Sequence, residues 1–134
     1  FRDEITSTYD PTLSTTNLEL DYNVRSMVHF WGSNQKLDLF EGVYNLDQYN
    51  RYDTYDPELF MGHGEGHDPV TPYEEALELQ DIYNTLGIYN ELKTLLLPNG
   101  NPAGHGVWNG QVDDKNLFDL SFDFIVSRQN LILE

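Results

Sequence analysis

The stretch that decides the predicted fold, residues 17–30, reads NLELDYNVRSMVHF. Apolar residues take most of the alternate positions from Leu18 to Phe30, and charged or amide residues stand between them as far as Arg25. Side chains that alternate with a period of two point to opposite faces of an extended chain, so this pattern predicts a β-strand. Toward its end both faces turn apolar, and Gly32 then closes the strand.

A second stretch near the other end of the chain, residues 116–128, shows the same alternation and reads NLFDLSFDFIVSR. Phe118 and Phe124 fall on one face of an extended chain, and Asp119 and Asp123 fall on the other. One-sided alternation is typical of a sheet with one solvated face. The two stretches therefore predict the centre of a mostly antiparallel sheet.

The region between them contains the signals of a helix. Thr71 to Glu74 forms a T-x-x-E capping box with proline at the first helical position, and apolar residues then recur at spacings of three and four. This pattern predicts a helix over about residues 72–97, which Gly87 either kinks or divides. The prolines and glycine of residues 98–102 end it.

Together these elements predict an α+β domain in which one main helix packs on a mostly antiparallel sheet, and a β-sandwich with one helix is the alternative. The length of 134 residues suits one hydrophobic core, so we expect residues 17–134 to form a single globular domain. Residues 1–16 are polar and rich in serine and threonine, which predicts an N-terminal arm. Because the sequence opens at Phe1, we expect a processed or trimmed chain.

The charge balance restricts the partners that the chain can bind. It has 23 acidic and 7 basic residues, a formal net charge of -16, which repels nucleic acid and anionic membrane surfaces. The absence of cysteine excludes disulfides, thiolate metal sites and cysteine nucleophiles. No run of about 18 apolar residues is present, so the sequence predicts no membrane span. Organism and compartment stay open.

The segment MGHGEGHD carries the most pointed local motif. In an extended backbone His63, Glu65 and His67 project to one side, where two imidazoles and a carboxylate can converge on a divalent metal. His29 or His105 would add a further ligand. The opposing interpretation is an exposed loop whose glycines serve turn geometry. We favour the loop and expect no cofactor, with a divalent metal at this motif as the alternative.

A long segment without periodicity, residues 33–70, is rich in tyrosine, aspartate and asparagine. Tyrosine offers a rigid amphipathic contact surface and aspartate adaptable hydrogen bonds, a mixture suited to recognising proteins or sugars. The opposing interpretation is that the tyrosines pack the rim of the domain. The predicted interaction residues are Tyr44, Tyr49, Tyr52, Asp53, Tyr55 and Asp56.

The sequence has no G-x-S-x-G elbow, no phosphate-binding lysine loop and no dinucleotide fingerprint, so no catalytic motif is indicated. We therefore expect a non-catalytic structural subunit of a multimeric assembly, such as a virion or phage tail or neck component. Its partners would be other protein subunits, reached through the arm, strand edges and the tyrosine-rich segment. A virion or extracellular assembly is the favoured location. The alternatives are a carbohydrate- or protein-binding module and a mononuclear metal-dependent enzyme using His63, Glu65 and His67.

Overall fold

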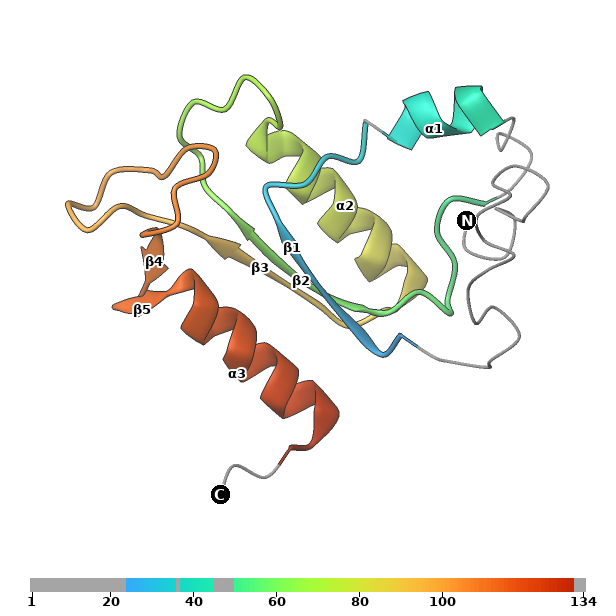
Figure 1. Cartoon of the computed structure of the whole chain (residues 1–134). Helices are drawn as coiled ribbons and strands as arrows, with labels where there is room; N and C mark the ends of the chain where they lie inside the picture. Colours follow the sequence, from blue (N-terminus) through green and yellow to red (C-terminus); the bar gives the residue numbers. More distant parts are fainter. Residues whose placement is uncertain (1–23, 36, 45–49, 132–134) are drawn as a thin grey trace, which may run out of the picture.

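The computed structural model describes residues 24–35, 37–44 and 50–131, and the predicted arm of residues 1–16 lies outside them. Figure 1 shows the arrangement of the described elements. Within this part of the chain, no helix is long and apolar enough to cross a membrane. The elements in chain order are β1 (Ser26–Phe30), α1 (Leu37–Tyr44), β2 (Glu58–His63), α2 (Tyr73–Leu86), β3 (Asn90–Thr94), β4 (Gln111–Val112), β5 (Lys115–Asn116) and α3 (Leu117–Gln129).

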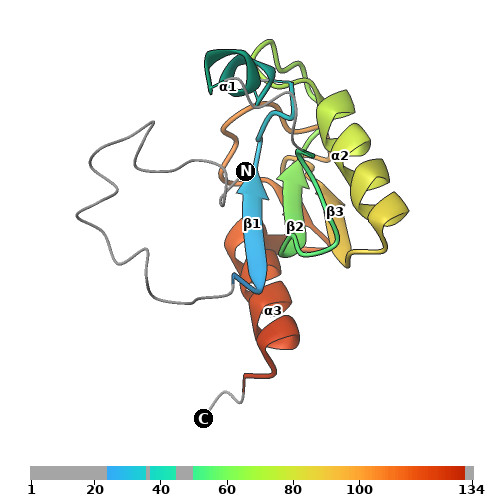
Figure 2. The same ribbon diagram turned by 90° about the vertical axis from the view of Figure 1, so that its right-hand side faces the viewer.

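The main sheet has three parallel strands in the order β1, β2, β3, which lie side by side in Figure 2. Met27 is paired with Leu59, and Met61 is paired with Leu92. The predicted mostly antiparallel sheet is therefore wrong, and so is the β-sandwich alternative. The physical reason is that α2 carries the chain back between β2 and β3, so both strands run in the same direction. Of the strand pairs in the described residues, the short β4 and β5 pair is antiparallel.

Strand β2 is covered on both faces. Leu59 and Met61 pack toward α2, whereas Phe60 belongs to the core cluster that includes α3 residues. These three side chains are almost completely buried, and each contributes about 1.5–3 kcal/mol to stability. A strand buried on both faces shows no polar alternation, which explains why periodicity did not predict β2. Figure 1 shows the sheet between α2 and α3.

The stretch 116–128, predicted as a strand, forms helix α3 instead. The side chain of Asn116 caps this helix, because it accepts hydrogen bonds from two backbone N–H groups of the first turn at 2.9 and 3.0 Å. The buried residues Leu117, Ser121 and Phe124 follow the spacing of one helix face. The stretch thus fits both a period of two and a helical period, and the cap favours the helix.

The helix predicted over residues 72–97 ends at Leu86, and a strand of the sheet occupies its second half. Gly87 adopts the left-handed conformation with φ 72°, and its N–H donates to the carbonyl of Asn84. Glycine has no Cβ to oppose this conformation, so it ends the helix rather than kinking it. The following residues then gain a strand partner in β2.

The strand predicted over residues 17–30 is confirmed for Ser26–Phe30, and residues 17–23 lie outside the described part. Val28 and Phe30 of this strand pack against the cluster that contains Leu117 and Phe124 of α3. The two alternating stretches therefore contribute to one core, although one of them is a helix.

Candidate active site

The loops that follow β2 and β3 meet at the carboxyl edge of the sheet. We call them the Asp68 loop (residues 64–71) and the His105 loop (residues 95–110). The N–H of Gly66 donates to the carbonyl of Ala103 at 2.8 Å, which joins the two loops directly. In open α/β sheets, ligands bind outside the carboxyl ends of the strands. We therefore expect a functional site at this edge of the sheet.

Glycines set the separation of the two loops. A Cβ at Gly64 would lie 2.2 Å from the carbonyl oxygen of Ala103, and a Cβ at Gly66 would lie 2.6 Å from the same atom. Both distances are far below van der Waals contact. The loops consequently pack backbone against backbone, and the glycines of the predicted metal motif serve this close approach.

The carboxylate of Asp68 is fully buried, and donors satisfy both of its oxygens. Oδ1 accepts the N–H groups of Val70 and Thr71 at 2.8 and 2.9 Å. Oδ2 accepts the Thr71 hydroxyl and His105 Nδ1, each at 2.8 Å. Burial alone would raise the pKa of Asp68, but the hydrogen bonds from Thr71, Val70 and His105 hold that pKa well below its usual range. Asp68 is therefore a carboxylate at neutral pH.

His105 faces this carboxylate with one nitrogen and leaves much of its ring open. Nδ1 lies 2.8 Å from Asp68 Oδ2 and 3.0 Å from the Thr71 hydroxyl oxygen. A carboxylate only accepts, so Nδ1 carries the hydrogen and Nε2 of the neutral ring carries the lone pair. The His105 side chain is 40% exposed, and its ring centroid lies 6.0 Å from that of Trp31. A buried acid thus orients an accessible base.

A second imidazole, that of His63, lies beneath the Asp68 loop and is only 1% exposed. Its Nδ1 lies 3.0 Å from the carbonyl oxygen of Gly64, and its Nε2 lies 2.8 Å from that of Thr71. The same Nε2 is 3.8 Å from Asp68 Oδ2. Tyr73 packs its ring edge-on against this imidazole at 5.6 Å. Both ring nitrogens of His63 therefore face carbonyl oxygens inside the fold, and the N–H of a neutral ring donates to one of them.

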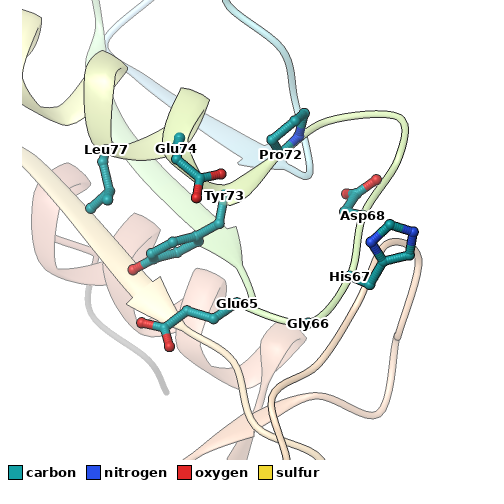
Figure 3. Close-up of a pocket in the computed structure, with 8 residues that line it drawn as sticks. All are labelled: Glu65, Gly66, His67, Asp68, Pro72, Tyr73, Glu74 and Leu77. Carbon is teal, nitrogen blue, oxygen red and sulfur yellow. The ribbon is translucent and has the colours of Figure 1, made fainter.

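A cavity of about 530 Å³ lies beside the Asp68 loop at the start of α2. Figure 3 shows the carboxylate of Glu65 on the side of Tyr73, with the ring of His67 near Asp68 on the other side. Glu65 and Glu74 make the lining acidic, which disfavours an anionic ligand. The lining residues are Glu65, Gly66, His67, Asp68, Pro72, Tyr73, Glu74 and Leu77.

The three residues of the predicted metal motif occupy different environments. His63 is buried at the end of β2, whereas Glu65 and His67 are exposed. The strand ends at His63, so the alternation assumed for an extended backbone does not continue past it. Among the described residues, no group of three or more histidines, aspartates and glutamates is placed to hold a metal ion. The metal site and the expected absence of a cofactor both stay predictions.

Tyr52 is a predicted interaction residue whose side chain makes contacts inside the fold. Its hydroxyl donates to Asn34 Oδ1 at 2.6 Å, and its ring packs edge-on against Tyr83 with centroids 6.0 Å apart. Burial, together with nearby acidic groups, raises the pKa of Tyr52 to about 12, against the effect of Arg51. Its polar group is therefore used within the domain, in agreement with the alternative of rim packing.

The other predicted interaction residues form a turn or lie outside the described part. Asp53 accepts the N–H of Tyr55 at 2.7 Å, and Asp56 accepts the N–H of Asp53 at 3.0 Å. Tyr55 is 90% exposed. Tyr49 and the side chain of Tyr44 are not among the described groups. The interaction surface stays a prediction.

Asp68 and His105 are the residues that the sequence interpretation missed as a pair. His105 was considered only as an additional metal ligand, and Asp68 had no assigned role. Each follows a strand of the parallel sheet, and His105 stands between two glycines. That signal becomes readable only when β2 and β3 are recognised as neighbouring parallel strands.

Comparison of the chain with known protein families, with curated proteins and with solved structures gave no match. No relative therefore suggests a role for Asp68, His105 or the cavity. The function of the chain is therefore inferred from the geometry and chemistry of the site alone.

Proposed function

We propose that this chain carries the acid and base of a hydrolase of the Ser-His-Asp type. The observation that supports this is the 2.8 Å contact between the buried carboxylate of Asp68 and Nδ1 of the accessible His105 ring. In such enzymes the aspartate fixes the tautomer of the histidine and stabilises the imidazolium that forms during reaction. Asp68 would be the orienting acid, and His105 Nε2 the general base.

The fold supports the same proposal. In α/β-hydrolases the nucleophile, the acid and the base follow in the chain order serine, aspartate or glutamate, histidine, at the top of a largely parallel sheet. Here Asp68 follows β2 and His105 follows β3, with helices on both faces of the sheet. The order and the strand ends agree with this class.

The proposal requires a nucleophile beyond the Asp68 and His105 loops. The 134 residues contain no G-x-S-x-G elbow. We propose that the nucleophile reaches the site from the β1 side of the sheet, because β1 pairs only with β2 among the described strands. A parallel strand paired there would have its carboxyl end at the edge that holds Asp68 and His105.

The proposed chemistry is acyl transfer from an ester or amide. The nucleophile's hydroxyl passes its proton to His105 Nε2 while its oxygen bonds to the carbonyl carbon. The tetrahedral intermediate then collapses, and the imidazolium returns the proton to the leaving group. Water repeats both steps on the acyl-enzyme and releases the acid. Throughout, Asp68 stays ionised and bonded to Nδ1.

The expectation of a non-catalytic assembly subunit, and the alternatives of a binding module and a metal enzyme, stay untested predictions. The assembly subunit and the binding module give no role to the buried Asp68 and its contact with His105. The hydrolase proposal explains why a carboxylate is buried with all its donors next to an accessible imidazole. We therefore favour it over the other three.

The test assays the purified protein with p-nitrophenyl acetate and a fluorophosphonate probe that modifies active serines. His105→Gln is compared with His29→Gln, the same change at a histidine of strand β1 that does not line the cavity. We expect His105→Gln to lower the hydrolysis rate about 10²–10⁴-fold and to prevent labelling, with His29→Gln close to wild type. Equal labelling and hydrolysis in wild type and His105→Gln would overturn the proposal.

A further inference from the structure

We propose that His63 is the positioning residue of this site: it holds the Asp68 loop closed and thereby aims Asp68 at His105. The inference rests on the proposed hydrolase function for its catalytic meaning. Its structural part is supported by the contacts of His63 with the two ends of the Asp68 loop. His63 does not itself line the cavity and has no contact with His105 among those described above, but it packs against Tyr73, and its Nε2 lies 3.8 Å from Asp68 Oδ2; both of these residues line the cavity.

Both ends of the Asp68 loop lie against the side chain of His63. The first carbonyl of the loop, that of Gly64, lies 3.0 Å from Nδ1, and the last carbonyl, that of Thr71, lies 2.8 Å from Nε2. A carbonyl oxygen only accepts, and a neutral imidazole carries one N–H, so the ring donates to one of these two carbonyls. We assign the N–H to Nε2, which lies closer to its carbonyl, so the buried ring ties the Thr71 end of the loop to the end of β2.

A short path of hydrogen bonds connects this closure to the reacting base. Thr71, whose carbonyl meets His63, gives its N–H to Asp68 at 2.9 Å and its hydroxyl at 2.8 Å. Asp68 in turn accepts His105 Nδ1 at 2.8 Å. Releasing the Thr71 carbonyl would shift two of the donors that orient the carboxylate. A small displacement at this point changes the direction of the His105 ring.

The His63 ring is itself firmly held, which a positioning group requires. It is 1% exposed, and Tyr73 packs edge-on against it. The backbone carbonyl of His63 also accepts the N–H of Leu95 at 2.7 Å, at the start of the His105 loop. An apolar side chain could fill the same space, but it would leave a buried carbonyl of the loop without the N–H of the His63 ring as its donor.

The experiment follows the His105 Nδ1–H proton by NMR in protein labelled with ¹⁵N-histidine, which needs no enzymatic activity. His63→Phe keeps a flat ring and removes the ring N–H donor, whereas His63→Gln keeps an amide donor. His29→Phe on the neighbouring strand β1 is the control, the same chemical change at a half-buried histidine. We expect the His105 Nδ1–H signal to be lost in His63→Phe, partly restored in His63→Gln and kept in His29→Phe.

In the hydrolysis assay, His63→Phe should lower kcat about 10²-fold with little change in KM, because the base is misplaced while substrate contacts stay. A folded His63→Phe protein with the wild-type His105 signal would overturn the proposal. If that variant does not fold, the wild type decides: fast exchange of the His63 Nε2–H would overturn the proposal, and protection from exchange would support it. Absent hydrolysis with a His63-dependent His105 signal would remove the hydrolase function and keep the positioning role.

Discussion

The Asp68 loop and the His105 loop share one edge of the sheet, yet they hold their reactive side chains differently. Asp68 is fully buried and accepts four hydrogen bonds. His105 is 40% exposed and stands between Gly104 and Gly106, the latter with φ 70°. The fold therefore fixes the acid in place, whereas the base stays accessible to a nucleophile and a substrate.

The largest effect is expected when the fixed acid loses its charge. Asp68→Asn keeps the shape but presents an amide where His105 and Thr71 need an acceptor. We expect hydrolysis to fall by about 10⁴-fold, the size of loss known when an asparagine replaces the aspartate of a Ser-His-Asp site. The value of kcat for p-nitrophenyl acetate measures it, with Asp53→Asn as a control in an exposed turn. A wild-type kcat in Asp68→Asn contradicts the role of the acid.

The next largest effect is expected when the packing between the Asp68 loop and the His105 loop is disturbed. Gly64→Ala places a Cβ against the carbonyl of Ala103, and we expect the free energy of unfolding to fall by about 1–3 kcal/mol. Gly42→Ala in α1 is the matched control, because no neighbouring atom lies within 4 Å of its added Cβ. We expect that control to be neutral or slightly stabilising. Urea unfolding of both variants provides the comparison, and equal stabilities would count against tight loop packing.

The Thr71 hydroxyl tests how much one donor contributes to fixing the acid. Thr71→Val removes the 2.8 Å hydrogen bond to Asp68 Oδ2, and we expect a loss of about 1 kcal/mol in unfolding free energy. Thr71→Ser keeps the hydroxyl and should stay close to wild type. Urea unfolding measures both proteins. A valine variant as stable as the wild type would show that the hydroxyl contributes nothing to fixing the acid.

The smallest effect is the dependence of stability on pH. The pKa of Asp68 is lowered in the folded protein, so its contribution is fully present above the unfolded pKa of about 3.9. That contribution is lost progressively as the pH falls below this value. We expect the stability gap between wild type and Asp68→Asn, measured by urea unfolding, to be constant from pH 5 to 7 and to narrow below about pH 4. A gap that widens toward acid would contradict the hydrogen-bonded carboxylate.

Local signals in the sequence predicted the elements that depend on local chemistry. Alternation over Ser26–Phe30 predicted a strand. Pro72, followed by the acidic residues Glu74 and Glu75, predicted the start of α2. Gly87 was recognised as a breaker, although its left-handed conformation as the end of the helix was not. The T-x-x-E motif itself misled, because the Thr71 hydroxyl bonds Asp68 and leaves α2 without a side-chain cap.

The remaining fold depends on contacts that a linear pattern does not contain. Strand β2 is apolar on both faces because helices cover both, so it lacks the alternation of a half-exposed strand. The stretch 116–128 satisfies two periods at once, and only the Asn116 cap and packing on the sheet separate them. The wrong prediction of a mostly antiparallel sheet followed from these two errors.

The site was hidden for the same reason. Asp68 and His105 are 37 positions apart, and only the parallel pairing of β2 with β3 brings their loops together. The metal hypothesis at His63, Glu65 and His67 assumed an extended backbone that stops at His63. A correct strand assignment would have drawn attention to polar residues at two adjacent carboxyl ends.

The most direct test of the central claim is a double-mutant cycle on hydrolysis with Asp68→Asn, His105→Gln and the combined variant. If Asp68 works only by orienting His105, the double variant should be no slower than the slower single variant, since groups acting as one unit are strongly non-additive. Losses that multiply in the double variant would mean that the two residues act independently, and the proposed acid–base pair would be wrong.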